Sequence, residues 1–197
     1  MLAGYGTVTP NRRTAILRAA LASFEEHGFE AATIEDVRRR SGASIGSIYH
    51  HFSGKEQLAG ALYVDVLAGY QDGLLAALDG HPGACAGVRA VVEHHVAWVV
   101  AHPAEARFLL GGRPAAAESG LRAANRAFFA RVTAWLDGHV AAGAVVAAPF
   151  DVFHALWLGP AQEWSRHWLS DRAPTPPDQA TPLLADAAWA ALSKEIP

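Results

Sequence analysis

The chain has 197 residues, of which 51% are hydrophobic and 18% charged, and its formal net charge is −3. This composition excludes a disordered chain and predicts a globular protein that is long enough to bury a proper core. Residues 1–55 hold seven Lys and Arg against five acids, whereas the remaining residues hold nine against fourteen. The slight basicity of the N-terminal part permits contact with nucleic acid without requiring it.

A single cysteine, Cys85, excludes an intrachain disulfide and favours a reducing compartment. We expect Cys85 to be a small buried or half-buried residue, with a redox sensor as the alternative. The first ten residues lack a charged, long apolar segment of the secretory type. No apolar run approaches the roughly eighteen residues of a membrane-spanning helix. The sequence therefore predicts a cytoplasmic protein with no membrane partner.

The chain is expected to open with a disordered lead-in at residues 1–8, followed by a helix that Thr9-Pro10 caps. This first helix carries an apolar stripe at helical spacing, formed by Ile16, Ala20 and Phe24. Gly28 is predicted to end the helix in the left-handed conformation, with Phe29 as its apolar partner.

Two short helices joined by a tight turn are predicted between residues 33 and 52. Thr33 followed by Asp36 is a capping-box pattern at the start of the first helix. Gly42 breaks that helix, and Ser44 caps the second one. This pattern is typical of a helix-turn-helix, whose second helix can enter the major groove of DNA. An ordinary corner between two helices is the alternative interpretation.

The rest of the chain reads as helices separated by turns. A long helix is predicted at 55–78, and an Ala-rich region follows with helices at 84–101, 103–110, 115–141, 149–170 and 178–194. Pro103 and Pro114 are expected just inside helix starts, and Gly159-Pro160 should kink the helix at 149–170. No strand-like alternation persists, so we predict an all-α protein.

Two blocks of the sequence resemble the TetR family of bacterial transcriptional regulators. They are RxxILxAAxxxFxxxGFxxxTIxDV, from Arg13 to Val37, and SGASIGSIYHHFSGKEQL, from Ser41 to Leu58. The resemblance covers about residues 10–60 and is only architectural beyond them.

This resemblance implies an N-terminal three-helix helix-turn-helix DNA-binding domain at 9–55, with its recognition unit at 33–52. The long helix would join it to a C-terminal helical ligand-binding and dimerisation domain at 56–197. A protein of this kind is a repressor with no enzymatic activity and no cofactor. It binds double-stranded palindromic operator DNA as a homodimer and is released by a small, largely hydrophobic effector.

A helical wheel divides the second short helix into two faces. Ile48 and Phe52 lie on one side and are expected in the core, whereas Gly46, Ser47 and His50 project to another. Gly46 has no side chain and lets the helix approach DNA closely, whereas Ser47 and His50 can bond to base edges or phosphates. We predict that the DNA-contacting residues are Thr33, Ser44, Ile45, Gly46, Ser47, Tyr49, His50 and Lys55.

Two of these residues leave alternatives open. Ile45 stands where many family members carry a Lys or a polar residue, so it either packs inward or contacts a thymine methyl group. Lys55 opens the long helix, where an ammonium group and free backbone N–H groups both favour phosphate. Arg38, Arg39 and Arg40 either contact the DNA backbone or solvate an exposed face.

The resemblance places the homodimer interface on the helices near 149–170 and 178–194. An aromatic stripe too large for one solvent face lies on the first of them, formed by Phe153, Trp157, Trp164 and Trp168. An apolar effector pocket is expected among aromatic and imidazole side chains of the C-terminal helices. The candidates, each with a plain core residue as the alternative, are His94, Trp98, Phe108, Phe128, Trp135, His154 and Trp157.

Three other classes of function are alternatives to a regulator. An all-helical enzyme lacks support, because the sequence holds no G-x-S-x-G, no phosphate-binding glycine loop and no HExxH. A metal-responsive sensor lacks a Cys/His zinc spacing, and His94 and His95 point about 100° apart on a helix. The third alternative is a chain that kept the fold but acts only as a binding partner. We therefore predict no metal site and no catalytic residues.

Overall fold

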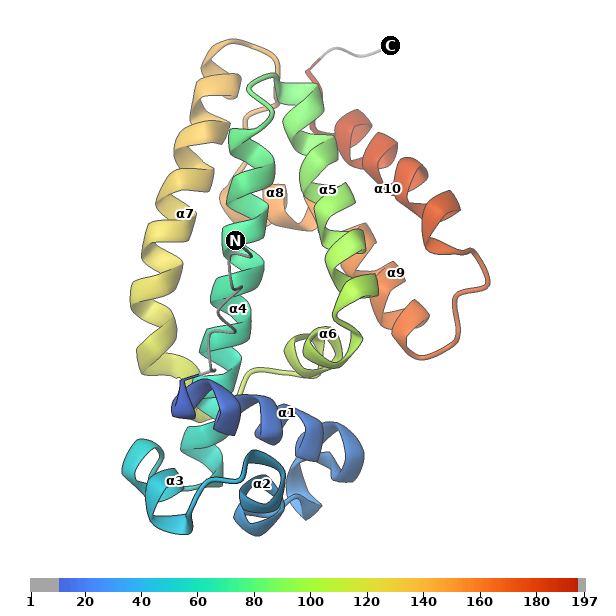
Figure 1. Cartoon of the computed structure of the whole chain (residues 1–197). Coiled ribbons are helices and arrows are strands. Elements are labelled where there is room, and N and C mark those ends of the chain that lie inside the picture. The colour runs from blue at the N-terminus through green and yellow to red at the C-terminus, as the bar shows by residue number, and fades with distance from the viewer. Residues whose placement is uncertain (1–10, 195–197) are drawn as a thin grey trace, which may run out of the picture. The chain divides into compact units, whose positions relative to one another are not determined.

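The computed structural model describes residues 11–194, apart from the side chains of Ser119, Ala123 and Ala124 (Figure 1). In this part of the chain ten α-helices and one short 3-10 helix form, and the single β-type contact is an isolated bridge between Val145 and Ser193. The prediction of an all-α protein is confirmed. The predicted lead-in at 1–8 and the Thr9-Pro10 cap lie outside the described residues.

The described chain divides into two compact units. The first extends to Tyr63 and includes the distant segment Arg113–Glu118, and the second comprises Val64–Gly112 and the residues from Ser119 onward. The division falls inside the long helix α4 (Lys55–Asp79). The predicted domain boundary between residues 55 and 56 stays a prediction.

The first unit contains α1 (Arg12–Ala31), α2 (Ile34–Ser41), α3 (Ile45–His51) and the start of α4 (Figure 1). The side chain of Asn11 accepts a hydrogen bond from the backbone N–H of Arg13 at 3.3 Å and caps α1. Apolar residues at helical spacing turn inward from each helix and are almost completely buried: Ile16, Ala20, Val37, Ile48 and Leu58.

Gly28 interrupts α1 as the sequence predicts, although with a different backbone conformation. Its φ of 74° is positive but its ψ is 159°, which lies outside the left-handed helical region. The chain therefore bends and continues to Ala31 before the helix ends. The rings of Phe24 and Phe29 meet across the bend with centroids 5.4 Å apart, so the predicted apolar contact is present.

The second unit contains the rest of α4 with α5 (Ala84–Ala101), α6 (Pro103–Leu110), most of α7 (Glu118–Ala141) and three C-terminal helices. These are α8 (Phe150–Trp157), α9 (Gly159–Leu169) and α10 (Pro177–Leu192). Figure 1 shows α10 lying along α5, with which it packs more extensively than with α8 or α9.

Two helix predictions in this region need correction. The segment 149–170 forms two helices instead of one kinked helix, because Pro160 cannot donate a backbone hydrogen bond and the chain turns at Leu158. Pro114 stands just before the 3-10 helix Ala115–Ala117, and not inside a helix start. Pro103 does occupy the first position of α6, as predicted.

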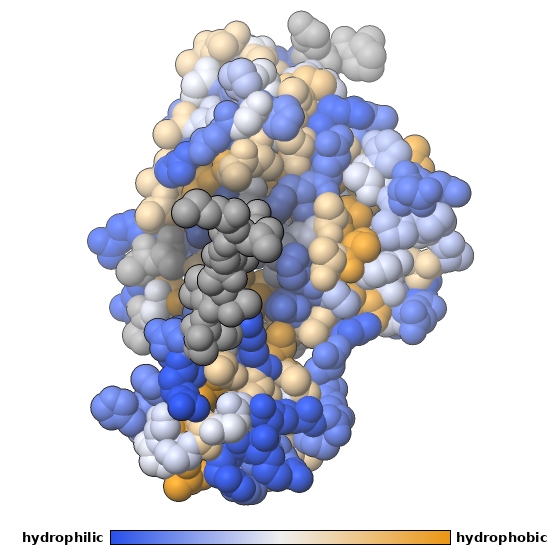
Figure 2. All heavy atoms as spheres, in the orientation of Figure 1, coloured by the Kyte–Doolittle hydropathy of each residue, from blue (hydrophilic) through white to orange (hydrophobic). Residues whose placement is uncertain are grey.

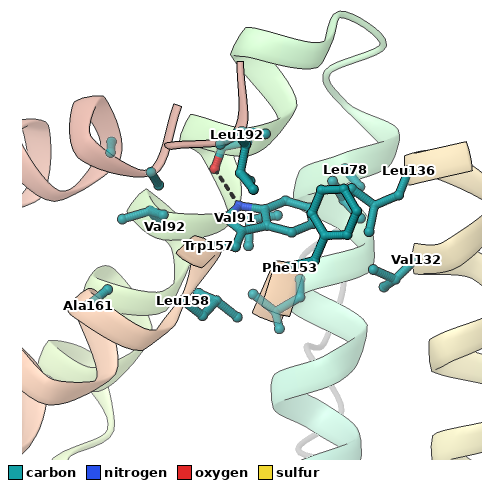
Figure 3. Close-up of a cluster of buried hydrophobic side chains, with 14 of the residues drawn as sticks. Leu78, Val91, Val92, Val132, Leu136, Phe153, Trp157, Leu158, Ala161 and Leu192 are labelled. Carbon is teal, nitrogen blue, oxygen red and sulfur yellow. Dashed lines mark hydrogen bonds between the residues drawn. The ribbon is translucent and has the colours of Figure 1, made fainter. Parts of the chain in front are cut away.

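Trp157 of α8 lies at the centre of the core of the second unit. Its side chain is only 5% exposed, and its indole Nε1–H donates to the carbonyl oxygen of Val88 at 2.9 Å. Figure 3 shows its ring among apolar side chains of several helices, including Leu78, Val91 and Leu192. Filling this centre with a large aromatic residue whose N–H is satisfied anchors α8 against α5.

The aromatic stripe assigned to the dimer surface is therefore partly wrong. Phe153 and Trp157 are 4% and 5% exposed and pack inside one chain, because α8 turns this face toward α4 and α5. Trp164 and Trp168 of α9 are half-buried, and their rings stack with centroids 6.1 Å apart.

Cys85 is exposed instead of buried, since it follows Ala84 in the first turn of α5 and faces away from the core that Ala84 joins.

In the part of the chain that the structure describes, no helix combines the length and the apolar character that crossing a membrane requires.

Candidate nucleic-acid interface and ligand cavity

Reciprocal hydrogen bonds fix the start of α2. The backbone N–H of Asp36 donates to Thr33 Oγ1 at 3.2 Å, and the N–H and hydroxyl of Thr33 donate to Asp36 Oδ2 at 3.0 and 2.6 Å. The predicted capping box is confirmed. The hydrogen bond from the Thr33 side chain, followed by those from Arg39 and the Thr33 backbone, lowers the pKa of Asp36 to about 2.

A left-handed residue and a second cap position α3. Gly42 has φ 62° and ψ 13°, the conformation that the turn after α2 requires. Ser44 Oγ then accepts the backbone N–H of Ser47 at 3.1 Å, which confirms Ser44 as the N-cap of α3. The two short helices and their turn form the predicted helix-turn-helix.

The helix α3 presents one buried and one open face. Ile48 is fully buried, whereas Tyr49 is 53% exposed and Ile45 is 46% exposed. Gly46 and His50 are exposed on the same side, and nothing lies within 4 Å of the position that a Cβ on Gly46 would occupy. Of the two alternatives left for Ile45, inward packing is not what the structure shows. Figure 2 shows a hydrophobic patch over α3 beside a hydrophilic surface over α2.

Lys55 is engaged within the first unit. Its ammonium donates to the carbonyl oxygens of Phe29 and Glu30, both at 2.8 Å, and lies 4.7 Å from the centroid of the Phe29 ring. These contacts fasten the first turn of α4 to the end of α1. A phosphate contact by Lys55 would have to use the remaining N–H of the ammonium.

The three consecutive arginines of α2 are paired with acids of their own unit. Arg38 donates to both oxygens of Glu35, at 2.8 and 2.6 Å, and the Arg38 hydrogen bond lowers the pKa of Glu35. Arg39 pairs with Asp36, and Arg40 pairs with Glu26 of α1. Pairs at the surface contribute little to stability, and each of the three guanidinium groups has an acidic partner within the first unit.

The second unit contains a cavity of about 440 Å³ that is open to solvent on one side, and its volume is within the range of small-molecule sites. It is lined by apolar side chains from α4, α7, α8 and α9 and by a few polar groups: Leu67, Tyr70, Gln71, Leu74, Asn125, Phe128, Phe129, Phe150, Asp151, His154, Leu158 and Gln162. A smaller apolar void of about 40 Å³ adjoins it and is bounded by Phe153 and Trp157.

The structure brings only some of the predicted effector residues to this place. Phe128 and His154 line both spaces, and Trp157 lines the smaller one. Trp98, Phe108 and Trp135 line neither, and the ring of Trp135 stacks on Trp157 with centroids 5.7 Å apart. Trp98 and Trp135 pack against the core of the second unit, and Phe108 is half-buried.

His94 lies outside both spaces as well. Its ring packs so closely against Gly73 that a Cβ there would come within 2.3 Å of it. Burial lowers the pKa of His94, and its Nε2 is buried without a hydrogen-bond partner. The neutral imidazole therefore acts as a packing group between α4 and α5.

A hydrogen-bonded chain of three side chains crosses the core of the second unit. The hydroxyl of Tyr70 lies 2.8 Å from His95 Nδ1, and His95 Nε2 lies 3.1 Å from Ser165 Oγ. Burial lowers the pKa of His95 to about 4. Although a Ser–His pair is the usual arrangement of a nucleophile and its base, Ser165 is fully buried and its hydroxyl is closed to a substrate. The chain of bonds therefore ties α4, α5 and α9 together.

Sequence reasoning missed the amide side chains of the cavity. Gln71 of α4 is 6% exposed and its Nε2 donates to Asn125 Oδ1 of α7 at 2.8 Å. Aromatic and imidazole residues alone, on which the predicted pocket was based, do not reveal this pair. The signal available in the sequence was the position of Gln71 on the apolar side of α4. It lies four residues from Leu67 and three from Leu74, where a buried side chain is expected.

The two units together define a class: a helix-turn-helix protein with a second, all-α unit that contains a ligand-sized cavity. Residues 16–62 match the sequence profile of the family described as "Bacterial regulatory proteins, tetR family". A solved structure of a putative TetR-family transcription regulator from Shewanella sp. PV-4 superposes with a TM-score of 0.77. It covers 93% of this chain and 98% of its own at 21% identity, which shows the common fold.

Curated relatives match over shorter stretches. The transcriptional repressor KstR2 of Mycobacterium tuberculosis is 34% identical over 110 residues, which span 50% of this chain and 53% of KstR2. The repressor AcnR of Corynebacterium efficiens is 46% identical over 52 residues, or 26% of this chain and 28% of AcnR. The chain thus spans about half the length of KstR2 and less of AcnR. The family profile assigns residues 16–62 to the TetR family, and the fold shared with TetR-family structures extends over nearly the whole chain.

Proposed function

We propose that the protein is a DNA-binding transcriptional regulator and not an enzyme. It acts as a repressor that binds a palindromic operator as a homodimer and leaves it when a small, largely hydrophobic molecule binds. The DNA-binding domain is assigned to residues 9–55 and the effector-binding and dimerisation domain to 56–197. The relatives described as transcriptional repressors support the regulatory part of this proposal.

The proposal rests on the contrast between the buried and the exposed face of α3. With Ile48 fully buried, the helix is held so that Ile45, Tyr49 and His50 stand outward on one side. Gly46 allows this side to approach a duplex closely, and Ile45 offers an apolar contact for a thymine methyl group. The hydroxyl of Tyr49 and the ring of His50 can bond to phosphates, which set the position of the helix on DNA.

A DNA-binding measurement tests this proposal. The purified protein should bind the DNA upstream of its own gene, with an affinity that falls steeply as salt is raised. Removing two phosphate contacts with a Tyr49→Phe, His50→Ala variant should weaken binding at least tenfold and lower the salt slope. The variant His27→Ala, which changes an exposed histidine of the same unit at a distance in sequence from α3, serves as the control. Equal affinities of the wild type and the double variant would refute this DNA-binding mode.

The homodimer is proposed to form through the segments 149–170 and 178–194, which correspond to α8, α9 and α10. Val152 and Leu156 of α8 are 41% and 38% exposed, and Leu183 of α10 is 67% exposed, which leaves apolar surface on both helices. A Leu183→Glu variant should shift the protein from dimer to monomer in sedimentation analysis and reduce its DNA affinity. Val100→Glu places the same charge on an exposed apolar site of α5 and should leave the dimer intact.

A further inference from the structure

The cavity of the second unit has walls that suit a hydrocarbon. Aliphatic and aromatic side chains from four helices form them, among them Leu67, Leu74, Phe128, Phe150 and Leu158. Burying apolar ligand surface against such walls gives roughly 25 cal/mol for each Å² removed from water. The volume of about 440 Å³ is enough for a molecule with a medium-length chain or a few fused rings.

One hydrogen-bonded amide pair interrupts these walls. The bond from Gln71 Nε2 to Asn125 Oδ1 occupies one donor and one acceptor. Gln71 Oε1 and Asn125 Nδ2 are then the atoms that a ligand can use, as an acceptor and a donor side by side. A hydroxyl or an uncharged amide group matches both at once, because each can donate and accept.

The charges around the cavity argue against an ionised ligand. Among the lining residues that the structure describes there is no Lys or Arg, and Asp151 is the one carboxylate. Asp151 is exposed in the first turn of α8. Partial burial lowers the pKa of His154, which favours its uncharged form. A buried anion would meet no counter-charge here, and a cation would meet only the exposed, hydrated carboxylate of Asp151, so either would lose hydration with little compensation.

We propose that this cavity binds a hydrophobic small molecule whose polar group is uncharged, a long-chain alcohol or amide or a hydroxylated ring system, with that group bonded to Gln71 and Asn125. The proposal rests on the proposed function, since it takes the cavity as the effector site. It adds the chemical class of the effector and the two residues that recognise the polar group.

Three probes with the same chain separate the charge classes: 1-decanol, decanoate and decyltrimethylammonium. Isothermal titration of the full-length protein should show 1-decanol binding at least tenfold more tightly than either ion. Tighter binding of decanoate would overturn the proposal, and tighter binding of decyltrimethylammonium would overturn it in favour of a cationic ligand. Failure of all three to bind would also overturn it.

Two variants test the residues. Gln71→Met with Asn125→Leu removes the amide pair at similar volume, and the affinity for 1-decanol should fall roughly three- to tenfold, as loss of one net hydrogen bond implies. Gln162→Lys places a cation in the lining, so decanoate should gain at least tenfold while 1-decanol changes little. Gln179→Lys adds the same charge at an exposed site of α10 outside the lining and should leave all three affinities unchanged. An unchanged preference in both cavity variants would refute the assignment.

DNA binding is measured on the same preparations without any probe. If the protein binds its upstream DNA but prefers decanoate, the ligand class is wrong and the regulatory function stands. If 1-decanol binds as expected but no DNA is retained at any salt concentration, the ligand class stands and the proposed function is wrong.

Discussion

The two units of this protein differ in the sequence separation of the hydrogen bonds that stabilise each of them. In the first unit the decisive hydrogen bonds join residues three apart, Thr33 with Asp36 and Ser44 with Ser47. In the second unit they join residues far apart, as in the bond from Trp157 to Val88 and the bond from Gln71 to Asn125. The first unit is thus specified by local signals, and the second by packing between distant helices.

This difference has a functional consequence. A surface that reads DNA must present a few side chains at fixed positions, and short helices with strong caps achieve this locally. A cavity that receives a small molecule must be enclosed by several helices at once. The following variants test whether the long-range contacts of the second unit indeed outweigh the local caps of the first.

The largest effect is expected for Trp157→Ala. Removing this buried ring leaves a cavity at the centre of the second unit and deprives the Val88 carbonyl of its donor. We expect a loss of about 3–5 kcal/mol in the free energy of unfolding, measured by denaturant titration. Trp168→Ala, which removes a half-buried indole from α9, should cost clearly less. Equal losses would show that Trp157 is not the anchor of this core.

A pH-dependent loss of stability is expected from the buried His95. Burial lowers its pKa to about 4 in the folded state, whereas the unfolded chain has the ordinary value of 6.5. As pH falls from 7.5 to 5 the unfolded state takes up a proton that the folded state refuses, so about 2 kcal/mol of stability should be lost.

Comparison with His95→Gln isolates this contribution, because His94 and His154 have lowered pKa values too and add their own pH dependence. Denaturant titrations at pH 7.5 and pH 5 should give a smaller difference for His95→Gln than for the wild type. The exposed His81, changed to Gln, is the control for replacing a histidine outside the core. If His95→Gln lost as much stability between pH 7.5 and pH 5 as the wild type does, the prediction would be contradicted.

A smaller effect, about 1–2 kcal/mol, is expected for Lys55→Met. The substitution keeps the aliphatic stem and removes the charge-assisted bonds to the carbonyls of Phe29 and Glu30, which are the main long-range polar link of the first unit. Denaturant titration measures the loss, with the exposed Lys194→Met as control. Unchanged stability would show that the two bonds from Lys55 do not stabilise the first unit.

The salt dependence of DNA binding by Lys55→Met then decides between its two roles. A salt slope lower by about one supports the predicted phosphate contact. An unchanged slope would mean that Lys55 only bonds to the carbonyls of Phe29 and Glu30 and does not contact phosphate.

The smallest effect is expected for Thr33→Ala, which removes the cap of α2. An N-cap contributes typically about 1 kcal/mol, and the hydrogen bonds to Asp36 are lost with it. The pKa of Asp36 should rise from about 2 toward its ordinary value, which carboxyl chemical shifts report. Thr133→Ala on the exposed side of α7 is the control. A larger loss than that of Trp157→Ala would reverse the comparison between the units.

The local elements of this protein follow from short-range patterns in the sequence. The capping box at Thr33, the cap at Ser44 and the turn at Gly42 lie where the pattern predicts them, because each depends on residues within a few positions. The bounds of α5 and α6 follow from helical periodicity and from Pro103 in the same way. The all-α class is a sum of such local signals.

Contacts between side chains of different helices depend on how the helices pack, and short-range patterns do not reveal them. Trp157 became a core residue and Gln71 a cavity residue because α4, α5, α7 and α8 pack around both, which spacing along one helix cannot reveal. Lys55 found its partners 25 and 26 residues away in the bend after Gly28. A helical pattern tells which face of a helix is apolar, but the partner of that face is set by the free energy of packing all the helices together.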